Sequence, residues 1–107
     1  MERYGMVLKV KPGKLEEYKR LHADVWDEVI ETIKECNIEN YTIFHRDGYL
    51  FSYFEYTGED FEADMEKMAS DPVTQKWWEL CKPCQEPIED SNEDEWWAIM
   101  EEVFHCD

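Results

Sequence analysis

An Asp-Gly pair at residues 47 and 48 separates two runs of aromatic and β-branched residues. Residues 40–46 read NYTIFHR and residues 49–56 read YLFSYFEY, and both compositions are typical of strands. A two-residue Asp-Gly loop is the strongest short-range indication of a β-hairpin, because both residues of its turn need a positive φ. The pair therefore predicts two antiparallel strands over residues 40–56, and any fold of this chain has to contain them.

Hydrophobic periodicity predicts the remaining elements on either side of the hairpin. Alternation with a period of two predicts two further strands, over residues 4–10 and 100–106. Helical spacing of apolar residues predicts three helices, over residues 15–36, 60–69 and 72–80. Asp71 is the predicted N-cap of the last helix, because Pro72 is suited to the first helical position.

The order of these elements is β-α-β-β-α-β, which is the split βαβ arrangement of a ferredoxin-like α+β domain. Such a domain has a four-stranded antiparallel sheet with its helices on one face. The sequence contains no internal repeat and no low-complexity linker, so residues 1–107 are expected to form a single domain.

The chain carries 27 acidic and 11 basic side chains in 107 residues, a formal net charge of −16. Nucleic acids and anionic membranes bind proteins through Lys and Arg, so we expect neither as a partner.

No apolar run approaches the roughly 18 residues of a membrane span, and the first residues lack the apolar stretch of a signal peptide. We therefore expect a cytoplasmic protein whose four cysteines are reduced.

Large apolar side chains occupy both faces of the hairpin strands. They are Tyr41, Ile43, Phe44, Leu50, Phe51, Tyr53 and Phe54. Helices would cover one face of the sheet, so the other face would leave aromatic side chains in contact with water. A second copy of the same chain is the simplest cover. We therefore expect a homodimer in which two sheets pack face to face, a dimeric α/β barrel.

Tyr18 and His22 are four residues apart in the first predicted helix and therefore share one face of it. The same face continues through Val25, Val29 and Ile33, which makes it the inward one. Imidazole titrates near neutral pH, so His22 is a candidate general acid and base. A buried, hydrogen-bonded histidine with a purely structural role would have the same spacing.

Two pairs of adjacent tryptophans occur, at Trp77-Trp78 and at Trp96-Trp97. Neighbouring residues on a helix point about 100° apart, so one indole of each pair is expected to face an opening. An indole offers a flat apolar surface to the C–H face of a sugar and one N–H to a hydroxyl. The alternative is that one indole packs in the core and its neighbour only shields a rim.

Cys81 and Cys84 form a CxxC motif near the end of a predicted helix, among acidic residues. A redox pair needs a helix N-terminus to lower the thiol pKa, and a zinc site would need two more ligands. His105 and Cys106 are the only nearby pair of suitable type, and their spacing is unlike that of a zinc finger. Buried thiols are the simpler interpretation, and we expect neither a cofactor nor a metal.

The chain resembles the L-rhamnose mutarotase family along its whole length. The matching segments are EYKRLH (17–22), VW (25–26), Glu28, NYTIF (40–44), LF (50–51), QKWW (75–78) and EEVFH (101–105). The chain departs from the family at Asp27, where proline is usual. The resemblance implies a ferredoxin-like homodimer in which His22 is the catalytic acid and base. It also implies that four aromatic residues contact the sugar, namely Tyr18, Tyr41, Trp77 and Trp78.

A protein of this family would interconvert the α and β anomers of L-rhamnose or a related 6-deoxyhexose by opening and reclosing the pyranose ring. Acidic groups near His22 would be expected to raise its pKa.

The candidate site residues leave two other functions open. One is a dimeric ferredoxin-like monooxygenase acting on aromatic or haem-like substrates, and the other is a sugar-binding module without catalysis.

Overall fold

The computed structural model describes residues 1–93 and 95–107. Its elements follow in the order β1 (Glu2–Val10), α1 (Leu15–His22), α2 (Asp27–Glu35), β2 (Ile38–Arg46), β3 (Tyr49–Tyr56), α3 (Phe61–Ser70), α4 (Pro72–Cys81), the 3₁₀ helix η1 (Lys82–Cys84), β4 (Gln85–Glu86) and β5 (Ala98–Met100). Within the described residues, no helix is both long enough and apolar enough to cross a membrane.

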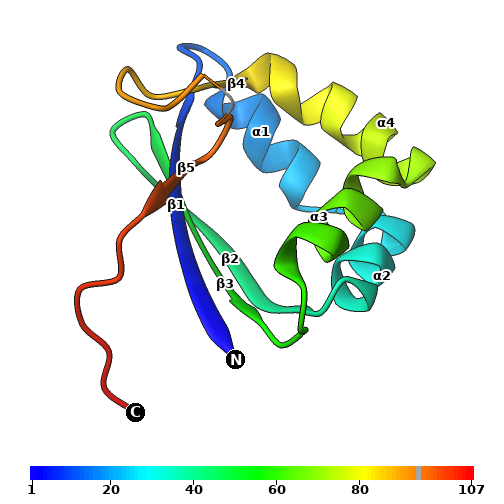
Figure 1. The fold of residues 1–107 in the computed structure, drawn as a ribbon. Coiled ribbons are helices and arrows are strands. Elements are labelled where there is room, and N and C mark those ends of the chain that lie inside the picture. Colours follow the sequence, from blue (N-terminus) through cyan, green and yellow to red (C-terminus); the bar gives the residue numbers. More distant parts are fainter. Residues whose placement is uncertain (94) are drawn as a thin grey trace.

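The strands form one antiparallel sheet in the order β2-β3-β1-β4, and β5 also pairs with β1. Because β3 pairs with β1 over residues 2–9, β4 and β5 both lie along the opposite edge of β1. The sheet curls around the helices, which lie on its concave side (Figure 1). These observations confirm the predicted α+β class and antiparallel sheet, with β4 and β5 together in the place of the fourth strand.

The Asp-Gly hairpin between β2 and β3 is confirmed. Asp47 and Gly48 have φ angles of 52° and 83°, and Arg46 pairs with Tyr49 across the turn. Aspartate tolerates this left-handed region and glycine adopts it freely. A two-residue turn of this kind fixes the register of its strands, so it decides which β2 and β3 side chains face the helices.

The prediction of one helix over residues 15–36 is wrong, because the chain forms α1 and α2 with residues 23–26 between them. Trp26 has an extended backbone with ψ of 137°, and its ring packs edge-on against Trp77 at 5.4 Å between ring centroids. Asp27 begins α2 at the position where the family that the chain resembles usually has proline, a residue favoured at the start of helices. Apolar periodicity misses this break because α1 and α2 both turn their apolar sides toward the same core.

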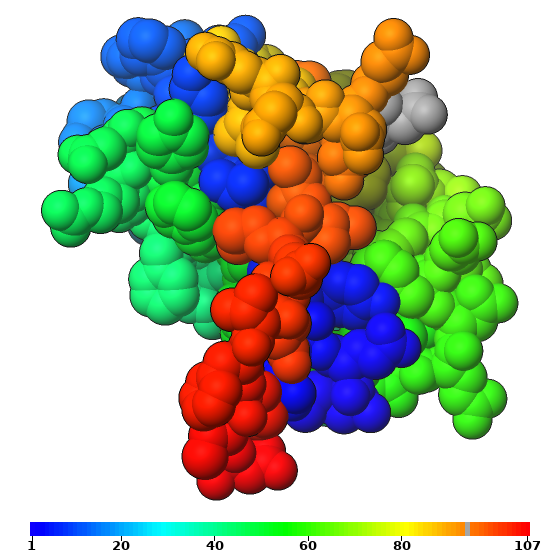
Figure 2. Space-filling model, turned by 60° about the vertical axis from the view of Figure 1, so that its left-hand side comes forward, coloured from blue at the N-terminus to red at the C-terminus, as the bar shows by residue number. Residues whose placement is uncertain are grey.

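The prediction of a last strand over residues 100–106 is also wrong, because β5 ends at Met100 and residues 101–107 form no strand. Val103 and Phe104 are 84% and 81% exposed. An ion pair of 3.1 Å between Arg3 Nε and Glu102 Oε2 ties the start of this C-terminal tail to β1. Beyond it the tail leaves the body of the molecule (Figure 2, red). No described segment pairs with the tail, so its apolar side chains cannot behave as a buried strand.

The core lies between the concave face of the sheet and the helices. Alternate residues of β1 and β3 are buried there: Leu8, Val10, Leu50, Ser52, Phe54 and Tyr56. The helices contribute Tyr18, Val29, Met68, Thr74 and Trp77. Tyr18 and Trp77 are thus buried and held by packing, which restricts the directions in which their polar atoms can point.

The convex face of the sheet carries exposed aromatic side chains. Phe44 lies opposite Phe51 in the β2–β3 pairing and is 62% exposed. Tyr49 is 41% exposed, whereas Phe51 and Tyr53 are half-buried. Coverage of this face by a second copy of the chain stays a prediction.

Candidate active site

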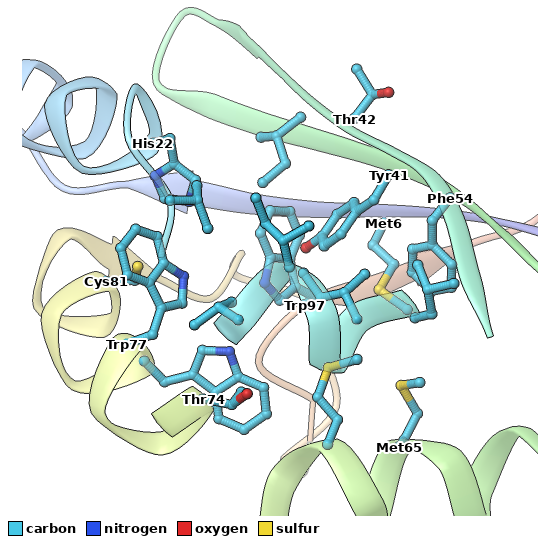
Figure 3. Close-up of a pocket in the computed structure, with 18 of the residues that line it drawn as sticks. Met6, His22, Tyr41, Thr42, Phe54, Met65, Thr74, Trp77, Cys81 and Trp97 are labelled. Carbon is cyan, nitrogen blue, oxygen red and sulfur yellow. The ribbon is translucent and has the colours of Figure 1, made fainter. Parts of the chain in front are cut away.

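A cavity of about 1170 Å³ opens between the concave face of the sheet and the helices. The five residues singled out from the sequence all line it: Tyr18, His22, Tyr41, Trp77 and Trp78. In Figure 3, His22 and Trp77 approach from the helices and Tyr41 approaches from the sheet. The fold therefore brings together residues from α1, α4 and β2 on one predominantly apolar cavity.

His22 is the last residue of α1, one turn after Tyr18, and the two rings stack with centroids 4.2 Å apart. The His22 Nδ1 atom lies 2.9 Å from the backbone carbonyl oxygen of Tyr18. A carbonyl can only accept, so Nδ1 carries the proton and donates this bond. In the neutral ring Nε2 is then the unprotonated nitrogen, with its lone pair free to accept a proton.

Burial lowers the pKa of His22, against the weaker opposing effect of the bond to the Tyr18 carbonyl. The expectation that nearby acids raise this pKa is therefore wrong. Desolvation dominates because the imidazolium loses water between apolar rings. The neutral ring is consequently the main form at neutral pH, which suits a group that must first accept a proton.

The adjacent tryptophans of α4 have different surroundings. Trp77 is 6% exposed and meets His22 edge-on, with ring centroids 5.3 Å apart and an interplanar angle of 68°. Trp78 is half-buried, and Lys82 Nζ lies 5.5 Å from the centre of its ring. Trp77 thus fixes one side of the imidazole, whereas Trp78 gives the cavity a second indole beside a cation.

Tyr41 enters the cavity because β2 is irregular at this point. Glu39 pairs with Glu55 and Thr42 with Tyr53, so two residues of β2 face the single residue Phe54. Such a bulge re-aims a side chain, and Asn40 with φ of 53° absorbs the local twist. Figure 3 shows the Tyr41 hydroxyl directed into the cavity.

The Tyr41 side chain is 42% exposed overall, but desolvation of its hydroxyl raises its pKa to about 12. Burial also raises the pKa of Tyr18. Both phenols therefore keep their protons at neutral pH and can donate hydrogen bonds to a ligand oxygen. A neutral polyhydroxylated molecule matches a site with such donors and with apolar walls.

Sequence reasoning missed Gln85, a buried residue of β4 that contacts Tyr18 directly. Gln85 Nε2 donates to the Tyr18 hydroxyl at 3.1 Å, and Gln85 Oε1 accepts from Trp96 Nε1 at 2.7 Å. Gln85, Trp96 and Trp97 also line the cavity. The adjacent tryptophans were visible in the sequence, whereas nothing in the sequence pattern distinguishes Gln85.

Cys81 and Cys84 are buried free thiols in the structure. Burial raises the pKa of Cys81 to about 12, and burial together with the bond to Glu17 raises that of Cys84 to about 11. Thiols with such pKa values are poor nucleophiles and poor metal ligands at neutral pH. Among residues 1–93 and 95–107, no group of three or more His, Cys, Asp or Glu side chains is placed to hold a metal ion.

Taken together, the curled α+β fold and its cavity define a small-molecule-binding protein equipped for proton transfer, with a neutral imidazole, two protonated phenols and several indoles around one ligand space. The family model described as L-rhamnose mutarotase matches residues 3–106. The chain is 33% identical to an L-rhamnose mutarotase of Oceanobacillus iheyensis and 34% identical to one of Bacillus subtilis, with 100% of each protein covered. The chain belongs to the L-rhamnose mutarotase family.

Solved structures that share the fold come from two kinds of enzyme. An L-rhamnose mutarotase of Formosa agariphila has a TM-score of 0.79 at 23% identity, with 100% of both chains covered. The tetracenomycin F2 cyclase of Streptomyces glaucescens, a type-II polyketide cyclase, has a TM-score of 0.73 at 18% identity, with 100% of this chain and 98% of that chain covered. One fold thus serves a sugar enzyme and a polyketide enzyme, so function has to be argued from the site.

Proposed function

We propose that the protein interconverts the α and β anomers of L-rhamnose or a closely related 6-deoxyhexose, with His22 as the acid and base. The observation that carries the proposal is the 2.9 Å contact between His22 Nδ1 and the Tyr18 carbonyl oxygen, which leaves Nε2 as the basic nitrogen of a ring set beside Tyr18 and Trp77 at the wall of the cavity. Family membership supports the same reaction.

The reaction needs two proton transfers and no change of oxidation state. His22 Nε2 takes the proton of the anomeric hydroxyl, the C1–O5 bond breaks, and the ring oxygen receives a proton from the imidazolium. The sugar is then an open-chain aldehyde. Rotation about C1–C2 and the reverse transfers close the ring on the other face of the aldehyde. One group that serves both transfers contributes about 10²- to 10⁴-fold in rate.

Four aromatic residues are proposed to hold the sugar while this occurs. The hydroxyls of Tyr18 and Tyr41 keep their protons at neutral pH and would donate them in hydrogen bonds to sugar oxygens. The indoles of Trp77 and Trp78 would contact the C–H face of the pyranose. The methyl group of a 6-deoxy sugar suits the apolar part of the cavity, to which Met6, Phe54 and Met65 contribute.

We also propose that the working form is a homodimer and that it is cytoplasmic. The exposed aromatic face formed by Phe44 and Tyr49, together with the apolar tail residues Val103 and Phe104, gives a second copy a surface to cover. The four cysteines are free thiols, which suits a reducing compartment.

Exchange between anomeric protons, measured by saturation-transfer NMR over a panel of 6-deoxyhexoses, tests the reaction and its substrate together. Irradiation of the α-anomer signal of L-rhamnose should reduce the β-anomer signal when the protein is present and much less in buffer alone. Exchange at the buffer rate with every sugar would contradict the proposal. Binding without faster exchange would instead indicate a sugar-binding module.

A further inference from the structure

We propose that Gln85 and Trp96 are positioning residues that direct the hydroxyl proton of Tyr18 into the cavity. Tyr18 thereby acts as a hydrogen-bond donor to the sugar rather than as an acceptor. This inference rests on the proposed function for the identity of the ligand, but the hydrogen-bond chain itself is present in the protein without any ligand.

The hydrogen-bond chain consists of two bonds and runs from Trp96 in the C-terminal segment to Tyr18 in α1. Trp96 Nε1 donates to Gln85 Oε1 at 2.7 Å, and Gln85 Nε2 donates to the Tyr18 hydroxyl at 3.1 Å. Gln85 and Tyr18 are 5% and 4% exposed, so water competes little for these bonds. Lys82 Nζ lies 5.8 Å from the ring centre of Trp96 and 5.5 Å from that of Trp78, which ties Trp96 to the α4 side of the cavity.

The chemistry of the three groups fixes the direction of both bonds. An indole nitrogen can only donate, so the amide oxygen of Gln85 has to face Trp96. The amide nitrogen then faces Tyr18, and the phenolic oxygen has to accept. The hydroxyl proton of Tyr18 must point elsewhere, and within residues 1–93 and 95–107 the hydroxyl donates to no protein acceptor. Tyr18 and Gln85 both line the cavity, so a ligand oxygen there is the natural acceptor.

The role of Trp96 follows from the near symmetry of an amide. Without the indole N–H, the Gln85 amide could turn over and present its oxygen to Tyr18. The phenol would then donate to Gln85, and its proton would no longer be available to the sugar. Trp96 therefore acts on the sugar through Gln85 and Tyr18, and the structure assigns it a role that a merely space-filling indole would not have.

Replacement of Gln85 by glutamate tests this directly, because the two side chains have the same shape. The introduced carboxylate would accept hydrogen bonds from both Trp96 Nε1 and the Tyr18 hydroxyl, so the Tyr18 proton would no longer face the sugar and we expect kcat/KM for L-rhamnose to fall about tenfold. Protonation of that buried carboxyl at lower pH would restore an O–H donor toward Tyr18. The ratio of kcat/KM between Gln85→Glu and the parent should therefore return toward one as the pH falls.

Parent and variant share His22, so the pH dependence that both have in common cancels in this ratio. The introduced carboxylate would also raise the pKa of His22, but this effect lowers the ratio as the pH falls and so cannot imitate a net return toward one. Glu86→Gln is the matched control, since it makes the opposite exchange one residue along β4 at a side chain paired with Lys9 outside the cavity. The ratio of kcat/KM between Glu86→Gln and the parent should stay at one over the whole pH range. A Gln85→Glu ratio that does not change with pH would overturn the inference even if the parent is an active mutarotase.

Trp96→Phe supplies a second variant that keeps an aromatic ring but lacks the N–H. It should lower kcat/KM severalfold with no recovery at low pH, whereas full parental activity would contradict the role of the indole N–H.

A readout without sugar separates this inference from the proposed function. The ¹⁵N–¹H signal of the Trp96 indole should shift in Gln85→Leu, which lacks the acceptor, and should stay in place in Glu86→Gln. An unmoved indole signal in a folded Gln85→Leu protein would overturn the hydrogen-bond chain. A parent that does not accelerate anomer exchange would overturn the proposed function. The indole spectrum would still show whether the hydrogen bonds between Trp96, Gln85 and Tyr18 exist.

Discussion

Two sets of contacts decide how the His22 imidazole can exchange protons. The Tyr18 carbonyl occupies Nδ1 at 2.9 Å and leaves Nε2 as the basic nitrogen. The rings of Tyr18 and Trp77 remove water from the imidazole, and this burial lowers its pKa. One set of contacts thus selects the nitrogen and the other keeps the ring neutral.

The pH dependence of the reaction follows from this lowered pKa. The base form of His22 has to be present at the start of each turnover, so kcat/KM should be constant at neutral pH and should fall as the pH drops through the lowered pKa. We expect the midpoint of the fall below the ordinary imidazole value of about 6.5. Exchange rates measured by NMR from pH 4.5 to 8 check this, and a midpoint above 7 would contradict the account.

Tyr41→Phe isolates the contribution of one hydroxyl. The change removes only the O–H that points into the cavity, so we expect KM for L-rhamnose to rise about 2- to 10-fold with little change in thermal stability. Tyr49→Phe is the matched control, since Tyr49 has a similar exposed fraction on the convex face of the same sheet. Equal KM values for the two variants would contradict a role of Tyr41 in binding.

The sequence predicted which residues line the site better than it predicted their chemical state. Their spacing of four residues on a helix made Tyr18 and His22 candidates, and an adjacent pair made Trp77 and Trp78 candidates. Their expected roles, and the choice of Tyr41, came from the resemblance to the family. The choice between the two nitrogens of His22 depends on a backbone carbonyl, and its lowered pKa depends on packing. Gln85 reaches Tyr18 across 67 residues of sequence, a distance over which local patterns carry no information.

Among the elements, α4 is capped by a side chain that also contacts a second helix. The Asp71 carboxylate oxygen Oδ2 accepts from the Thr74 amide at 2.9 Å and from the Thr74 hydroxyl at 2.8 Å. The Thr32 hydroxyl, which lies 3.0 Å from the Glu28 carbonyl oxygen, is also 3.4 Å from this carboxylate oxygen, so Asp71 caps α4 and contacts α2. These bonds hold the pKa of Asp71 below its usual value.

Asp71→Ala should therefore lower the urea midpoint of unfolding more than Asp60→Ala does. Asp60 caps α3 through one bond to the Ala63 amide, whereas removal of Asp71 also leaves the hydroxyl of the buried Thr74 without its acceptor. A depressed pKa stabilises the fold above the unfolded value of about 3.9, and this stabilisation is lost as the pH falls. The difference between parent and Asp71→Ala should accordingly shrink in acid, and a difference independent of pH would contradict the assignment.

Elements whose ends carry specific turn chemistry were predicted correctly. The Asp47-Gly48 turn and the Asp71-Pro72 helix start are local features, and both are confirmed. At the break between α1 and α2 the ring of Trp26 packs against Trp77, and β5 ends at Met100 with no described segment paired beyond it. Periodicity reports neither event, because α1 and α2 turn their apolar sides toward the same core and because strand pairing is decided between segments distant in sequence.

On the scale of the whole molecule, the aromatic convex face and the net charge of −16 have opposite effects on association. Apolar burial favours a dimer, whereas like charges on two copies repel one another. Salt weakens the repulsion between exposed charges and leaves apolar burial in place. Association through the convex face should therefore strengthen as ionic strength rises.

Sedimentation equilibrium tests this association. At micromolar concentration we expect twice the 13.0 kDa mass of one chain. Phe44→Glu should shift the mass toward the monomer, because Phe44 is 62% exposed on the convex face. Leu80→Glu is the control, since Leu80 is 44% exposed on α4 in the helical layer. A parent that sediments as a monomer would contradict the homodimer.

The central claim is that His22 transfers the protons that open and reclose the sugar ring. Saturation-transfer NMR on L-rhamnose with His22→Ala tests it most directly, beside His105→Ala as a matched histidine control in the C-terminal tail. We predict that the rate of anomer exchange falls about 10²- to 10⁴-fold in His22→Ala and stays at the parental rate in His105→Ala. A folded His22→Ala protein that exchanges the anomers as fast as the parent would contradict the account.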